Sequence, residues 1–124
     1  MKVLIVEDDR SMRELMKWVI ADLVDGFYEC SDGRSALAAY ETDHPDWVLM
    51  DIRMRDIDGL TATEQIVNTW PGARVLIVTG LNDASLREAA RRAGARGYVL
   101  KENLIEVRCW LEKDKLTLKN GTEL

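Results

Sequence analysis

The chain has 124 residues and a mass of 14.1 kDa, and 47% of its residues are hydrophobic and 31% are charged. This length fits one domain with a single core, and the composition excludes disordered, collagen-like and coiled-coil proteins. The net charge of −5 argues against nucleic acid or an anionic membrane as a direct partner of this chain.

Three features of the sequence predict a cytoplasmic location. No apolar run approaches the roughly 18 residues of a membrane span, and the N-terminus lacks the pattern of a secretion signal. Cys30 and Cys109 lie far apart and form no CxxC motif, which predicts inert, free thiols in a reducing compartment. His44 is the single histidine, which excludes a site that needs a pair of histidines as metal ligands.

Strand-like apolar segments alternate with segments of helical periodicity along the chain. Strands are predicted at 2–7, 26–31, 47–51, 73–80 and 97–101, and helices at 11–24, 33–43, 59–70, 83–94 and 103–114. The runs at 3–6, 47–50 and 75–78 are continuously apolar, as strands buried on both faces of a parallel sheet require. The alternation therefore predicts a doubly wound, three-layer α/β fold.

The first predicted helix carries a start signal and an apolar face. Ser11 and Glu14 have the form of a capping box, and Trp18 is interpreted as a packing residue. The residues that recur at helical spacing and predict an inward face are Met12, Leu15, Met16, Val19 and Leu23.

The chain divides into one predicted domain and a short tail. The alternating pattern covers residues 1–114 without an internal linker. Residues 115–124 are polar and carry no packing signal, which predicts a frayed tail or the start of a linker.

Polar side chains follow the predicted strands, at the end where ligands bind in open parallel sheets. These side chains belong to Glu7, Asp8, Asp51, Thr79 and Lys101. Because parallel strands bring their carboxyl ends to one edge, we expect an acidic cluster with one hydroxyl and one ammonium group.

Carboxylates crowded at one edge repel each other, and burial raises the free energy of each charge. A divalent cation relieves this repulsion, and Mg²⁺ prefers oxygen ligands and also binds phosphate. Lys101 and Thr79 add a positive charge and a hydroxyl donor for a phosphoryl group. The set predicts a phosphoryl-transfer site in which one carboxylate acts as nucleophile. We expect Asp9 to belong to the approach to the first helix and not to the metal site.

The segments LIVEDDRSMREL, WVLMDIRMRDIDGL, VLIVTG and GYVLK have the order and spacing of response-regulator receiver domains. The chain resembles this family over residues 2 to about 114. The resemblance implies a flavodoxin-like (βα)5 domain with a five-stranded parallel sheet of order 2-1-3-4-5. It also implies a two-component system in which a sensor histidine kinase phosphorylates an aspartate with Mg²⁺ as cofactor. Such a domain catalyses only its own phosphorylation and dephosphorylation, and is a regulator and not a metabolic enzyme.

The resemblance also assigns a role to each residue of the predicted site. Asp51 is expected to accept the phosphoryl group as an aspartyl phosphate, and Lys101 to pair with it. The metal ligands implied by the resemblance are Glu7, Asp8, Asp51 and the backbone carbonyl of Arg53.

In the same way, Thr79 resembles the switch hydroxyl of receivers and Tyr98 the aromatic residue coupled to it. Phosphorylation is then expected to alter the face formed by the fourth helix, fifth strand and fifth helix. Through this face the domain could form a homodimer or control transcription with a fused or partner DNA-binding output domain. The chain departs from the family at Arg55, Gly80 and Glu102, where proline, alanine and proline are usual, and none of these departures removes a chemical group of the site.

The last predicted helix has a second set of apolar residues. Leu104, Val107 and Leu111 share one face, whereas Ile105 and Cys109 lie at i and i+4 well away from it. We expect Ile105 and Cys109 to belong to a partner surface on the fourth-helix to fifth-helix side, where receivers commonly dimerise or contact an output domain.

Two other classes of function are left open. A phosphatase of the haloacid dehalogenase type needs a second aspartate two positions after the nucleophile, and this chain has Arg53 there. A stand-alone or phosphorylation-independent interaction module would keep the fold and lose the chemistry. The presence of all five predicted site residues argues against this module.

Overall fold

The computed structural model describes the backbone of residues 1–120 and the side chains of residues 1–114. Its centre is a parallel five-stranded sheet of order β2-β1-β3-β4-β5. The strands are β1 (Lys2–Val6), β2 (Gly26–Cys30), β3 (Trp47–Met50), β4 (Val75–Thr79) and β5 (Gly97–Leu100). The predicted flavodoxin-like fold and its strand order are confirmed.

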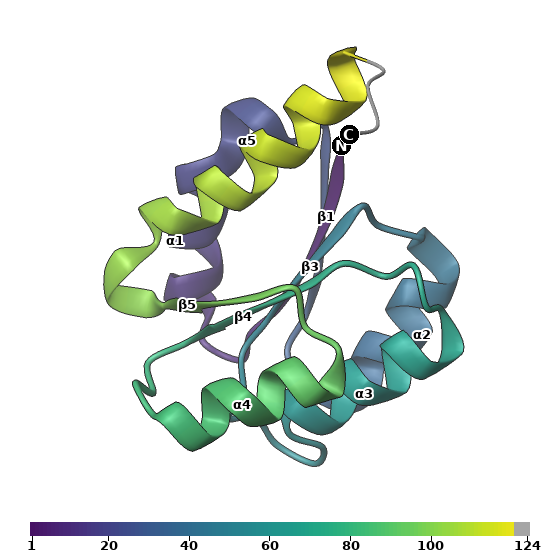
Figure 1. Ribbon diagram of the computed structural model, residues 1–124, viewed down its shortest axis with the longest axis vertical. Coiled ribbons are helices and arrows are strands. Elements are labelled where there is room, and N and C mark those ends of the chain that lie inside the picture. The colour runs from purple at the N-terminus through teal and green to yellow at the C-terminus, as the bar shows by residue number, and fades with distance from the viewer. Residues whose placement is uncertain (121–124) are drawn as a thin grey trace.

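Helices cover both faces of the sheet, with α1 and α5 on one face and α2, α3 and α4 on the other (Figure 1). The helices are α1 (Arg10–Ile20), α2 (Gly33–Asp43), α3 (Gly59–Thr69), α4 (Ala84–Ala93) and α5 (Ile105–Asn120), with 3₁₀ turns η1 (Ala21–Leu23) and η2 (Lys101–Asn103). None of the described helices has the length and apolar character to cross a membrane.

The helix α5 extends past residue 114, the predicted end of the domain, and reaches Asn120. The backbone of residues 115–120 is therefore helical, although their sequence is polar. Residues 121–124 lie outside the described residues, and the prediction that a linker begins in this region remains a prediction.

The sheet has one apolar core on each face, because successive side chains of each strand point to opposite sides. Leu4, Val48 and Ile77 pack toward α2, α3 and α4, whereas Ile5, Leu49 and their neighbours pack toward α1 and α5. Strands β3 and β4 are buried along their whole length, as the continuously apolar runs predict. This rigid double core fixes the strand ends that carry the polar residues.

The start of α1 differs from the prediction. Asp9 is the N-cap residue, and its carboxylate accepts a hydrogen bond of 2.9 Å from the backbone N–H of Ser11. The predicted capping box is therefore wrong, and Glu14 pairs with Lys17 instead. Asp9 has the extended backbone of a cap, and its short carboxylate reaches the free N–H groups of the first turn. The prediction that Asp9 belongs to the approach to this helix is confirmed.

Two apolar residues of α1 face the solvent. Trp18 is 78% exposed and Leu15 is 45% exposed, so the prediction that they pack inward is wrong. Met16 and Ile20 fill the inner face instead. At about 100° per residue, the apolar positions of this helix span a wider sector than the contact with the sheet can cover.

Candidate functional site

The pairing of the strands brings the predicted polar residues to one edge of the sheet. Val6 pairs with Met50, so Glu7 and Asp51, which directly follow these two strands, lie side by side. Thr79 pairs with Leu100, which places Lys101 next to the end of β4. The register of the sheet therefore brings these strand ends together from far apart in the sequence.

Two buried carboxylates share one ammonium group at this edge. Lys101 Nζ lies 2.8 Å from Glu7 Oε1 and 3.1 Å from Asp51 Oδ2. Glu7 is completely buried and Asp51 is only 4% exposed. Backbone N–H groups bind the remaining oxygens, with Asp9 donating to Glu7 Oε2 at 3.0 Å and Ile52 donating to Asp51 Oδ1 at 2.8 Å.

The environment disfavours the charge of Glu7 and favours the charge of Lys101. Burial raises the pKa of Glu7, and the nearby Asp51 charge adds to this increase, although hydrogen bonds from Lys101 and Asp9 act against it. Burial alone would lower the pKa of Lys101, but its pairing with Glu7 and Asp51 outweighs this effect and raises it. Lys101 is therefore held charged, whereas the negative charge of Glu7 is disfavoured.

The acidic cluster has the donor set of a site for a hard cation. Carboxylate oxygens of Glu7, Asp8 and Asp51 all lie within 4.8 Å of one another. Asp8 is exposed, so the cluster opens to solvent. An all-oxygen set with excess negative charge suits Mg²⁺, which keeps several water ligands. Arg53 is exposed, and the predicted role of its carbonyl remains a prediction.

A cavity of about 430 Å³ opens beside Asp8 at the same edge of the sheet. Its lining includes Asp32 and Arg55. The loop between β3 and α3 reaches Asp51 closely, since a Cβ atom at Gly59 would lie 1.8 Å from the Asp51 carbonyl oxygen. Only glycine fits there, because any side chain would collide with this backbone.

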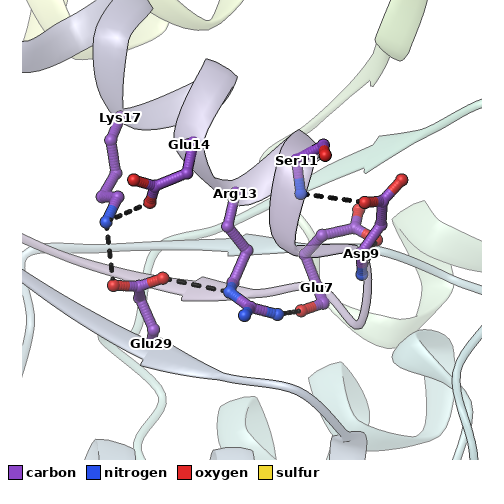
Figure 2. A network of polar contacts seen from close by, with 7 residues as sticks. All are labelled: Glu7, Asp9, Ser11, Arg13, Glu14, Lys17 and Glu29. Atoms are coloured by element: carbon purple, nitrogen blue, oxygen red, sulfur yellow. Dashed lines mark hydrogen bonds and ion pairs between the residues drawn. The ribbon is translucent and has the colours of Figure 1, made fainter.

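A polar network supports the loop that carries Glu7 and Asp8 (Figure 2). Arg13 of α1 donates to the Glu7 carbonyl oxygen at 2.8 Å and to Glu29 of β2 at 3.0 Å. Lys17 also donates to Glu29 at 3.0 Å. Glu29 thus connects β2 to α1 through Arg13 and Lys17. Arg13 also binds the backbone carbonyl of Glu7, a member of the acidic cluster. No motif in the sequence indicates this network, because its members come from separate elements.

The predicted switch residues are joined through the backbone of Leu81. Thr79 is buried, and its Oγ1 accepts a hydrogen bond of 3.3 Å from the Leu81 N–H. The Tyr98 hydroxyl donates to the Leu81 carbonyl oxygen at 2.5 Å. Thr79 and Tyr98 lie on neighbouring strands, so the loop after β4 provides a physical connection between them.

The predicted partner residues Ile105 and Cys109 are both exposed, Ile105 to 65%. Ile105 precedes Arg108 by about one turn, and Arg108 donates to the Val19 carbonyl oxygen of α1 at 2.9 Å. Ile105 therefore lies on the side of α5 that faces α1, and its role in a partner surface remains a prediction. The exposed Trp18 directly precedes Val19 in α1, the helix that Arg108 contacts.

Comparisons with known proteins agree at the levels of sequence and structure. The family model described as the response regulator receiver domain matches residues 3–107. Chemotaxis protein CheY of Halobacterium salinarum is 33% identical over 100 residues, which cover 81% of this chain and 83% of that protein. Transcriptional regulatory protein DegU of Brevibacillus brevis is 29% identical over 126 residues, and the match covers 97% of this chain and 51% of DegU.

The structural comparison includes a DNA-binding response regulator of the LuxR family from Staphylococcus aureus. Its solved structure has a TM-score of 0.79 to this chain at 26% sequence identity. The match covers 92% of this chain and 95% of that chain. The chain thus spans almost all of this structure but only about half of the length of DegU.

Proposed function

The chain belongs to the response regulator receiver family, and we propose that it is a phosphorylation switch in which Asp51 accepts a phosphoryl group from a sensor histidine kinase. The observation that carries this proposal is the position of Asp51. Its buried carboxylate lies 3.1 Å from Lys101 Nζ and within the acidic cluster of Glu7 and Asp8. A nucleophile, a phosphate-pairing cation and candidate metal ligands are therefore present in one place.

In the proposed reaction, a carboxylate oxygen of Asp51 forms a bond to phosphorus. The bond from phosphorus to the nitrogen or oxygen of the phosphodonor breaks, and the leaving group keeps the electron pair. The Ile52 N–H orients the Asp51 carboxylate through Oδ1, and Lys101 pairs with the phosphoryl oxygens as they arrive. Mg²⁺, held by Glu7, Asp8 and Asp51 with the Arg53 carbonyl, would neutralise charge on these oxygens.

Thr79 would respond to phosphorylation of Asp51. Its Oγ1 accepts from the Leu81 N–H, so its own proton is available for a phosphoryl oxygen. Movement of Thr79 toward that oxygen would displace Leu81, which also binds Tyr98. The change then reaches the face of α4, β5 and α5, where we propose that output is controlled. Control of transcription by a fused or partner DNA-binding domain is supported by likeness to DegU and to the LuxR-family regulator.

The proposed activity is limited to this self-modification, and no turnover of metabolites is expected. Contacts with the kinase or with a second copy of the chain would use exposed apolar side chains. We propose Ile105 and Cys109 for this purpose, together with Leu15 and Trp18 on the neighbouring helix. If Ile105→Asp left self-association of the phosphorylated protein unchanged in sedimentation velocity, the contribution of Ile105 to a homodimer would be rejected.

Incubation with acetyl phosphate and Mg²⁺ tests the central proposal. We expect intact mass spectrometry to show the gain of one phosphoryl group that hydroxylamine removes. The gain should disappear in Asp51→Asn and when a chelator removes Mg²⁺. A protein without this gain, or a gain that survives in Asp51→Asn, would contradict the proposal.

A further inference from the structure

Arg87 of α4 lies over the ring of Tyr98, with its guanidinium carbon 4.5 Å from the ring centroid. This distance is within the range of a cation–π interaction. Arg87 also makes a long hydrogen bond of 3.4 Å to the side chain of Asn82 in the loop after β4. Arg87 therefore contacts both the aromatic residue and the loop that this residue binds.

The neighbouring charges on α4 do not compete for Arg87. Glu88 pairs with Arg91 and Arg92, and Asp83 accepts hydrogen bonds from Ser85 as the helix cap. Among the side chains that the structure describes, Arg87 has no carboxylate within ion-pair distance. Its cation is thus free to remain on the Tyr98 ring.

A continuous chain of contacts leads from Arg87 to the buried end of β4. Arg87 covers the Tyr98 ring, the Tyr98 hydroxyl binds the Leu81 carbonyl oxygen, and the Leu81 N–H binds Thr79 Oγ1. A swing of Tyr98 into solvent would break the first two contacts together. The cation above the ring therefore favours the conformer in which Leu81 is held and the Thr79 proton points away from Leu81.

We propose that Arg87 is a positioning residue of the switch, which holds Tyr98 against the loop and thereby keeps the Thr79 hydroxyl ready to donate to a phosphoryl oxygen. The role of Thr79 as that donor rests on the proposed function. The hold on Tyr98 does not, because its contacts with Arg87 and Leu81 involve no phosphoryl group. An exposed cation–π contact of typical strength changes a conformer ratio about two- to fivefold.

The first measurement is ¹⁹F NMR of the unphosphorylated protein labelled with 3-fluorotyrosine. The chain has three tyrosines, and Tyr98→Phe assigns the signal of interest. In Arg87→Met, which keeps the aliphatic bulk without the charge, we expect the Tyr98 signal to become more sensitive to exchange of H₂O for D₂O. The ratio of loop-bound to exposed Tyr98 should fall about two- to fivefold.

Two variants separate positioning from general stability. Arg87→Lys keeps a cation and should recover most of the loop-bound conformer. Arg92→Met removes a neighbouring arginine of α4 that pairs with Glu88, and should leave the Tyr98 signal unchanged. An unchanged Tyr98 signal in Arg87→Met, or an equal change in all three variants, would overturn the proposal.

The second measurement is the rate of phosphorylation by acetyl phosphate with Mg²⁺. We expect Arg87→Met to slow it about two- to fivefold in the wild-type background and to have no further effect in Tyr98→Phe. An equal slowing in both backgrounds would show that Arg87 does not act through Tyr98 and would overturn the proposal. If the wild-type protein takes up no phosphoryl group, the proposed function fails while the NMR result still decides the position of Tyr98.

Discussion

At both ends of the sheet, one cation is shared by two carboxylates. At the carboxyl end, Lys101 pairs with Glu7 and Asp51, whose side chains are 1% and 5% exposed. At the amino end, Arg74 pairs with Asp46 and Asp114, whose side chains are 39% and 20% exposed. The two paired carboxylates of each cluster differ in their access to water, and the carboxyl end also has the exposed carboxylate of Asp8.

The amino-end cluster also has further donors. The Lys2 N–H donates to Asp46 at 2.7 Å, and the Trp47 indole N–H donates to Asp114 at 3.2 Å. Water and these donors stabilise the surplus negative charge of Asp46 and Asp114. The contacts of this cluster connect the strands to α5. At the carboxyl end the surplus negative charge is buried, and an added cation would relieve the repulsion between the carboxylates. The burial of Glu7 and Asp51, together with the third carboxylate of Asp8, distinguishes the carboxyl-end cluster from the amino-end cluster.

The largest effect is expected from Lys101→Met, which leaves Glu7 and Asp51 buried without their cation. Breaking such a pair should lower the free energy of unfolding by about 2–3 kcal/mol at neutral pH without Mg²⁺. Urea denaturation with and without Mg²⁺ measures this loss, and we expect the cation to restore part of it. A loss below about 0.5 kcal/mol would show that burial of Glu7 and Asp51 adds little to the strength of their pairing with Lys101.

Arg74→Met makes the matching change at the amino end. Because Asp46 and Asp114 keep water and N–H donors, the expected loss is smaller, about 1–2 kcal/mol. The same urea titrations should show a response to Mg²⁺ equal to that of the wild-type protein. If Arg74→Met were the more destabilising of the two, or abolished the Mg²⁺ response, the distinction between the ends would fail.

Glu7→Gln removes the surplus charge itself. The raised pKa of Glu7 means that its charged form is disfavoured in the folded protein, so this stability deficit grows as pH rises. A neutral side chain should therefore increase the free energy of unfolding by about 1 kcal/mol at pH 7 without Mg²⁺ and weaken the stabilisation by Mg²⁺. Glu14→Gln on the exposed side of α1 is the control. A variant less stable than the wild-type protein in the absence of divalent ions would disprove this account of Glu7.

Much of the carboxyl end could be predicted from the sequence because parallel strands impose it. Once β1, β3 and β4 are recognised from their apolar runs, the residues after them must meet at one edge. No such rule concerns the amino end. Asp46, Arg74 and Asp114 meet through packing between separate elements, and no spacing in the sequence indicates their contact.

The same limit explains the other differences. Ser11 and Asp9 are both residue types that favour the N-cap position of a helix. The helix α1 begins at Arg10, directly after β1 and a short loop, and this makes Asp9 the N-cap residue. Periodicity identifies α1, but the width of its contact with the sheet leaves Trp18 outside. Arg87 has no motif at all, because its partner Tyr98 is on another element. Local rules predict elements and strand ends, whereas contacts between helices and loops depend on side-chain packing.

The smallest effect concerns Glu29, where the sign of the pH dependence is opposite to that of Glu7. Lys17 first, and then Arg13, hold the pKa of Glu29 below its ordinary value. Its contribution is therefore present above the ordinary pKa and is lost as pH falls through the folded value. We expect Glu29→Gln to lower the free energy of unfolding by about 0.3 kcal/mol at pH 7 and low salt, and by nothing near pH 3. Paired urea titrations at the two pH values measure this difference. A Glu29→Gln protein more stable than the wild-type protein at pH 7, with a difference that disappears near pH 3, would mean that Glu29, like Glu7, is held in an environment that disfavours its charge.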